Sequence, residues 1–75
     1  MILNETIIGD LRFAGFLVSN KNGQTFIEGK SLAKVDWLIE CDFGRFYLYS
    51  CPDSYYALID EYDTLDKALE RSKHL

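Results

Sequence analysis

The sequence predicts a single small α+β domain over residues 1–75, in which an antiparallel sheet of four to five strands packs one face against a C-terminal amphipathic helix. Three observations support this prediction. Two aromatic segments flank a turn cluster at residues 52–54, an Asn-Gly pair divides an apolar stretch near the N-terminus, and residues 65–75 have helical periodicity. A chain of 75 residues holds one thin hydrophobic core.

The first hairpin is predicted around an Asn-Gly turn. Residues 11–19 and 24–28 are rich in apolar residues and flank the sequence Asn20-Lys21-Asn22-Gly23. An Asn-Gly pair supplies the positive φ angles that a two-residue hairpin turn requires. We therefore expect two antiparallel strands joined at this turn.

Residues 31–41 fit two alternatives. A strand from 34 to 41 would end in a turn at 42–44. It would set Val35, Trp37, Ile39 and Cys41 on one face and Asp36, Leu38, Glu40 and Asp42 on the other. A second helix at 31–40, capped by Ser31, would give a ββαββα arrangement but would leave Trp37 outside its apolar arc. A faint internal repeat, residues 16–19 and 31–34 against 47–50 and 64–67, favours the helix. We favour the strand because it buries the tryptophan.

The C-terminal half is predicted to form a second hairpin and a helix. Residues 45–51 and 55–62 are rich in aromatic and branched side chains and flank Pro52-Asp53-Ser54, so we expect two antiparallel strands. The helix over 65–75 has Asp63 or Thr64 as its N-cap and basic residues in its last turn. Its apolar arc is formed by Leu65, Ala68, Leu69, Ser72 and Leu75.

Pairing across a turn at residues 43–44 divides the predicted sheet into two faces. It sets Cys41 opposite Phe46, Ile39 opposite Leu48 and Trp37 opposite Ser50. The face expected under the helix holds Val35, Trp37, Ile39, Cys41, Phe46, Leu48, Tyr55, Ala57 and Ile59. The opposite face is expected to present Leu38, Tyr47, Tyr49, Tyr56 and Leu58, ringed by Asp36, Glu40, Asp42, Asp60 and Arg45. This second face stays uncovered unless the N-terminal hairpin folds over it as a second layer.

The acidic charge is concentrated between residues 36 and 66. That stretch carries eight acidic residues, eight of the eleven aromatics and one basic residue, Arg45, so its net charge is about −7 against −4 for the whole chain. A composition this rich in aromatics excludes a disordered acidic tail. An acidic surface would repel nucleic-acid phosphates and attract a basic protein. The sequence therefore predicts a basic protein partner and no direct binding of nucleic acid.

The chain offers little for catalysis, cofactors or metals. The only histidine, His74, is the penultimate residue, and the five glycines form no phosphate-binding loop. Cys41 and Cys51 would lie roughly 16 Å apart along paired strands, beyond the reach of a disulfide, and with His74 they are too few for a zinc site. We expect two free thiols, no metal, no cofactor and no enzymatic activity. The lack of a long apolar run predicts a cytoplasmic protein without a membrane interaction.

Two resemblances extend this interpretation. Residues 63–70 (DTLDKALE) resemble the strand-to-helix junction of antitoxins of the HicB type. The resemblance covers about a tenth of the chain and implies a small antiparallel sheet followed by a helix, as in an antitoxin-like or structural module. In size and charge the chain is also similar to small acidic phage proteins that disable host DNA-binding proteins or defence complexes.

The leading hypothesis is a non-enzymatic inhibitor or modulator that mimics nucleic acid and occupies the basic surface of a nucleic-acid-binding protein. The residues expected to contact this partner are Asp36, Leu38, Glu40, Asp42, Tyr47, Tyr49, Tyr56, Leu58 and Asp60. The alternative is a homodimer that buries the tyrosine face against its own copy.

Overall fold

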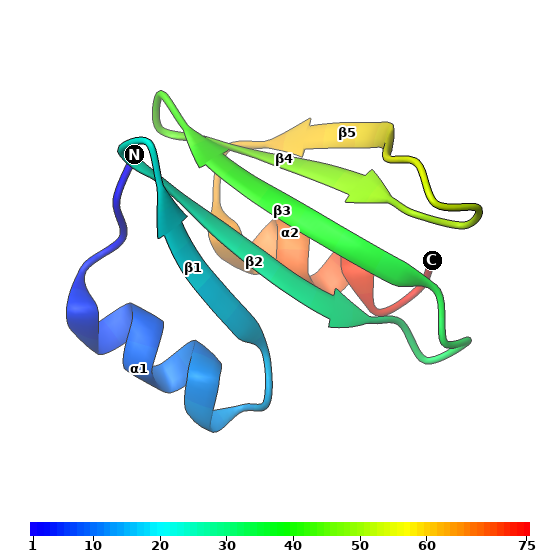
Figure 1. The fold of residues 1–75 in the computed structure, drawn as a ribbon, viewed down its shortest axis with the longest axis horizontal. Coiled ribbons are helices and arrows are strands. Elements are labelled where there is room, and N and C mark those ends of the chain that lie inside the picture. Colours follow the sequence, from blue (N-terminus) through cyan, green and yellow to red (C-terminus); the bar gives the residue numbers. More distant parts are fainter.

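The computed structural model describes residues 1–75 as a five-stranded antiparallel meander with one helix at each end of the chain (Figure 1). The sheet order is β1-β2-β3-β4-β5, so every strand pairs with its neighbours in sequence. The predicted α+β fold with a C-terminal helix on the sheet is confirmed. The elements are α1 (Glu5–Phe13), β1 (Leu17–Lys21), β2 (Gln24–Lys30), β3 (Asp36–Asp42), β4 (Arg45–Ser50), β5 (Ala57–Tyr62) and α2 (Leu65–Ser72).

Two tight turns set the register of the sheet. Asn22 and Gly23 join β1 to β2 with φ angles of 52° and 77°, as predicted for an Asn-Gly turn. Phe43 and Gly44 join β3 to β4 with φ angles of 49° and 72°. The resulting register confirms the predicted pairs Cys41–Phe46, Ile39–Leu48 and Trp37–Ser50.

The alternative of a second helix at 31–40 is wrong. Residues 36–42 form β3, and residues 31–35 form the connection from β2. The Ser31 hydroxyl accepts a hydrogen bond from the Val35 amide at 3.0 Å, which closes this connection as a turn. Val35 therefore lies in the turn and not in a strand. A strand is more favourable than a helix here because it buries the indole of Trp37 on the side where the helices pack.

The N-terminal helix α1 was not predicted. Of residues 11–19, expected in a strand, residues 11–13 belong to this helix, and the strand begins only at Leu17. Asn4 caps the helix by accepting a hydrogen bond from the Ile7 amide at 2.9 Å. Only Ile8 and Leu11 are buried along its length, and Gly9 lies in its middle. So narrow an apolar stripe is a weak sequence signal, and packing against β1 supplies the stability that helix propensity does not.

The core lies between the sheet and the two helices. In Figure 1, α2 lies behind the strands, where it contacts β4 and β5, while α1 lies beside the edge strand β1. Strands and helices contribute to one apolar cluster, formed by Leu3, Ile8, Leu11, Val18, Ile27, Trp37, Ile39, Cys41, Leu48 and Ala68. Both helices therefore support the same face of the sheet. No helix of the structure is long and apolar enough to cross a membrane.

The indole of Trp37 packs directly against the backbone of Gly29, its partner on β2. A Cβ atom at Gly29 would lie 2.6 Å from Cζ2 of Trp37, so only glycine leaves room for the ring. Phe16 packs on the same indole with ring centroids 5.5 Å apart. Trp37 is 2% exposed, and its buried Nε1 has no hydrogen-bond partner. The apolar contact of the ring outweighs the unpaired donor.

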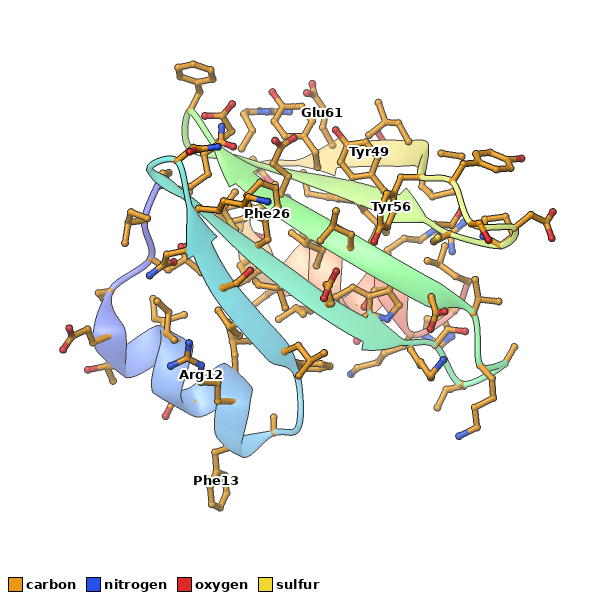
Figure 2. All side chains as sticks on the ribbon, viewed as in Figure 1. Arg12, Phe13, Phe26, Tyr49, Tyr56 and Glu61 are labelled. Carbon is orange, nitrogen blue, oxygen red and sulfur yellow. The ribbon has the colours of Figure 1, made fainter.

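Arg12 ties α1 to the edge of the sheet (Figure 2). Its Nη2 donates a hydrogen bond to the carbonyl oxygen of Val18 on β1 at 2.9 Å. Unpaired backbone groups on an edge strand invite pairing with another chain. The hydrogen bond from Arg12 satisfies one such acceptor, the Val18 carbonyl oxygen, so that it is not free to pair with another chain. The same bond helps to hold α1 beside β1.

Replacing Gly29 by Ala should lower the free energy of unfolding by about 1–3 kcal/mol, because the new methyl group displaces the Trp37 ring. Urea denaturation measures this change. The matched control is Gly9→Ala in α1, where no atom lies within 4 Å of a new Cβ, and it should stabilise the protein by about 0.5–1 kcal/mol. In a Trp37→Phe background the cost of Gly29→Ala should fall, and an unchanged cost would contradict the contact.

Candidate functional site

The sheet face turned away from the helices, called here the open face, carries side chains from every strand. Strand register arranges them in two rows across the sheet. The first row is Leu17, Glu28, Leu38, Tyr49 and Leu58, and the second is Ser19, Phe26, Glu40, Tyr47 and Glu61. None of these residues is buried, and the exposed fractions of Leu17 and Leu58 are 69% and 58%. The N-terminal hairpin extends the sheet and does not form a second layer over this face.

A hollow of about 160 Å³, called here the aromatic notch, lies on the open face. Figure 2 shows Phe26, Tyr49 and Tyr56 on the same side of the sheet, from β2, β4 and the residue preceding β5. The rings of Tyr49 and Tyr56 meet edge to face, with centroids 6.5 Å apart and planes at 78°. The notch is lined by Phe26, Leu38, Glu40, Tyr49 and Tyr56.

Carboxylates lie beside the phenol groups of the notch. The Tyr49 hydroxyl donates a hydrogen bond to Oε1 of Glu40 at 3.2 Å. Burial, and then the charge of Glu40, raises the pKa of Tyr49. Burial, and then the charge of Glu28, raises the pKa of Tyr56. Both hydroxyls therefore stay protonated at neutral pH and remain hydrogen-bond donors next to negative charge.

The basic side chains of the open face are mostly paired at its margins. Lys30 pairs with Asp36 at one end of the sheet, and Arg45 pairs with Glu61 at the other, where Nη2 and Oε1 are 3.2 Å apart. Glu28, Glu40 and Asp42 form no ion pair, and Lys21 is the basic residue left free beside the first turn. The uncompensated charge at the centre of the open face is therefore negative.

Eight of the nine residues predicted to bind a partner lie on or beside the open face, and Asp60 does not. A β-bulge between Leu48 and Tyr49 shifts the register, so Asp60 pairs with Leu48, whose side chain is buried under the helices. Glu61, opposite Tyr47, occupies the place predicted for Asp60. The eight are Asp36, Leu38, Glu40, Asp42, Tyr47, Tyr49, Tyr56 and Leu58.

The predicted covered face also needs correction at β5. Tyr55 precedes the strand and is 59% exposed, and Ile59, which the register shift leaves without a partner on β4, is 38% exposed. The strict alternation predicted for residues 55–62 fails because the bulge interrupts it. The helix-covered positions on β3 and β4 are as predicted, with Trp37, Ile39, Cys41 and Leu48 all buried.

Phe26, Glu28 and Glu61 lie on the open face, although the sequence pattern did not predict them there. The alternation on β2 contained a signal, since Thr25 and Ile27 are fully buried and Phe26 and Glu28 lie between or beside them. Phe26 and Ile27 are adjacent and both apolar, so the sequence does not distinguish the two faces there. Only the pairing of β2 with β3 assigns Phe26 to the row of Glu40.

The acidic charge of residues 36–66 is divided among several surfaces. Asp53 lies in the connection between β4 and β5, while Asp63 and Asp66 lie at the start of α2. Asp63 pairs there with Lys67, whose hydrogen bond and charge lower the pKa of that carboxyl. With Asp60, four of the eight acidic residues thus lie away from the open face.

The two cysteines are free, as expected, and differ in environment. Cys41 is fully buried on the helix-covered face, and burial raises the pKa of its thiol to about 11. Cys51 is half-buried after β4. His74 lies near the C-terminus, with Nε2 at 3.4 Å from Oε1 of Glu70 on α2. No group of three or more His, Cys, Asp or Glu side chains is placed to hold a metal ion.

Comparison with known proteins relates the chain to a phage protein. Residues 3–75 match the model of a family described as a family of unknown function, DUF5495. The chain is 37% identical over 68 residues to a protein of Enterobacteria phage T4 described as an uncharacterized 9.8 kDa protein in the Gp55-nrdG intergenic region. The alignment covers 89% of this chain and 72% of the phage protein. No solved structure matches the chain.

Thiol labelling should distinguish the two cysteines. In the folded protein Cys51 should react with a thiol reagent at pH 8, whereas Cys41 should react only after unfolding, because the buried thiol is rarely ionised below its pKa of about 11. The thiol of Cys41 ionises near 9.0 in the unfolded chain, so stability should fall as the pH rises from about 9 to about 11. Equal labelling of both thiols in the native state would contradict the burial of Cys41.

Two substitutions test the assignment of the faces. Tyr49→Glu, on the open face, should leave the protein folded at a cost of about 1 kcal/mol. Trp37→Ala should cost about 3–5 kcal/mol because it empties the core above Gly29. So small a core makes Trp37→Ala largely unfolded at room temperature. Circular dichroism with urea denaturation measures both, and the reverse order of costs would mean that the faces are exchanged.

Proposed function

Since the chain belongs to the DUF5495 family and has a relative in phage T4, we propose that it is a small phage-type accessory protein that inhibits or modulates a partner protein by binding it. The observation that carries this proposal is the open face, a continuous sheet surface of tyrosines, aliphatic side chains and unpaired carboxylates with no element packed on it. Exposed apolar groups rimmed with charge are typical of protein-binding surfaces.

The tyrosines suit the role of anchors. Tyr47 and Tyr49 are half-buried on β4, and Tyr49 is held by its hydrogen bond to Glu40 and by the ring of Tyr56. Side chains that are already ordered lose little conformational entropy on binding. Tyrosine also combines a large apolar area with a polar tip, and it is enriched among the residues that dominate binding energy.

Charge selects the class of partner. Glu28, Glu40 and Asp42 are negative and unpaired, so they favour a surface rich in lysine and arginine. Surfaces of this composition are those with which proteins bind the phosphates of nucleic acids. We therefore infer that the partner is a basic, nucleic-acid-binding protein, and that the open face competes with its nucleic acid.

The chemistry of the open face supports binding over catalysis. Its titratable groups are carboxylates and phenols, with Lys30, Arg45 and the thiol of Cys51 at the margins, and the imidazole is not among them. Cys41 is buried under the helices, and His74 lies beside Glu70 on α2. A nucleophile with an adjacent base is the usual requirement for covalent catalysis, and the open face brings no such pair together.

Affinity capture at two salt concentrations tests the proposal. The immobilised protein should retain a basic, nucleic-acid-binding protein at about 50 mM salt and release it at about 500 mM, because screening weakens exposed charge pairs. Tyr49→Glu should weaken the captured complex by about 2 kcal/mol or more, measured by calorimetry. Arg71→Gln, which lowers the net charge by the same amount on α2, is the matched control and should bind like the wild type.

Two results would contradict the proposal. Retention that is insensitive to salt and to Tyr49→Glu would mean that another surface binds. A dimer at micromolar concentration in light scattering, disrupted by Tyr49→Glu, would mean that the open face binds a second copy of the chain, as in the alternative of a homodimeric module.

A further inference from the structure

We propose that the aromatic notch is a binding site for a single guanidinium group, so that one arginine side chain of the partner is the residue recognised at the centre of the open face. This inference rests on the proposed function and deepens it, because it names the chemical group that the open face selects. The notch itself is a feature of this chain and can be tested without a partner.

The walls of the notch suit a planar cation. The rings of Tyr49 and Tyr56 lie at 78° to one another, and Phe26 contributes a third ring from β2, with Leu38 between them on β3. An aromatic face carries partial negative charge and attracts a cation placed within about 6 Å of its centre. Three rings around one hollow provide such faces, and the aliphatic side chain of Leu38 lets the methylene groups of a long side chain pack beside them.

Charge in the notch favours the same ligand. Glu40 lines the hollow, and only its Oε1 is engaged, by the Tyr49 hydroxyl at 3.2 Å. Glu28 lies opposite Leu38 and near enough to Tyr56 to contribute to the raised pKa of that phenol. Neither carboxylate has a basic partner within the protein, because Lys30 and Arg45 pair with other acids at the margins. A bound cation would compensate both charges, whereas an anion would be repelled.

The notch itself has room for one side chain. Sites for drug-sized molecules and cofactors occupy about 300–1,000 Å³, and the notch measures about 160 Å³. The end of an arginine side chain fits a hollow of this size. Arginine is favoured over lysine because its guanidinium is planar, weakly hydrated and able to donate two parallel hydrogen bonds to a carboxylate while it stacks on a ring.

A titration followed by NMR tests the site directly. The probes are the N-acetyl methylamides of arginine, of citrulline, which has nearly the same shape without the charge, and of lysine. The arginine compound should bind with millimolar affinity, with chemical-shift changes centred on Leu38, Tyr49 and Tyr56. Citrulline should bind at least tenfold more weakly and lysine severalfold more weakly. Equal binding of arginine and citrulline, or shifts centred elsewhere, would overturn the inference.

Adjacent tyrosines provide a matched pair of variants. Tyr56→Leu removes a wall of the notch and should weaken binding of the arginine compound about tenfold. Tyr55→Leu removes an exposed tyrosine that does not line the notch and should leave binding unchanged. Glu40→Gln should weaken binding at least fivefold, whereas Tyr49→Phe, which keeps the ring, should have a smaller effect than Tyr49→Leu. An equal loss in Tyr55→Leu and Tyr56→Leu would overturn the assignment of the site.

The two proposals fail in distinguishable ways. Salt-sensitive capture of a basic protein together with no binding of the arginine compound would refute the guanidinium site and leave the proposed function intact. Binding of the arginine compound in the notch together with no basic partner at low salt would refute the proposed function, and would leave the notch as a guanidinium site whose ligand is not a basic protein surface.

Discussion

The contact between the Trp37 indole and the backbone of Gly29 is the constraint on which the rest of the structure depends. The contact places the largest side chain of the sheet on the side of the helices. Because Gly29 has no side chain, the indole can lie over its backbone where β2 pairs with β3. Because side chains alternate along a strand, every neighbour of Trp37 in β3 is then assigned to a face. Leu38 and Glu40 must lie on the open face once Trp37 and Ile39 are buried.

The two helices make the sheet asymmetric. α1 packs beside β1 and α2 packs against β4 and β5, and both contribute to one core behind the strands. The chain forms one sheet and these two helices, so no element remains to cover the other side. Apolar and aromatic side chains therefore stay in solvent on the open face. Packing on the covered face nevertheless determines where these side chains lie, because side chains on both faces project from the same strands.

The unpaired charge near the aromatic notch is negative. Ion pairs at the margins neutralise the exposed basic residues Lys30 and Arg45, while Glu28 and Glu40 stay unpaired near the aromatic notch. Exposed pairs such as these contribute little to stability. Their effect is on the distribution of charge. Because Lys30 and Arg45 are paired at the margins, the carboxylates beside the aromatic rings in the middle of the sheet have no basic partner. The local arrangement of a few residues is thus more informative than the net charge of the whole chain.

The sequence by itself determined the hairpins, the β3–β4 register and the C-terminal helix, because these depend on local chemistry. Asn22-Gly23 and Phe43-Gly44 close two-residue turns, the period of two then sets which side chains are opposite, and Thr64 caps α2 by accepting a hydrogen bond from the Lys67 amide at 3.2 Å. Only the tertiary structure decided the rest. α1 has a narrow apolar stripe that becomes stable by packing on β1, and the bulge beside Leu48 moves Asp60 off the open face and puts Glu61 on it. Phe26 joins Tyr49 and Tyr56 through strand pairing across two turns, a long-range arrangement that no local pattern of residues encodes.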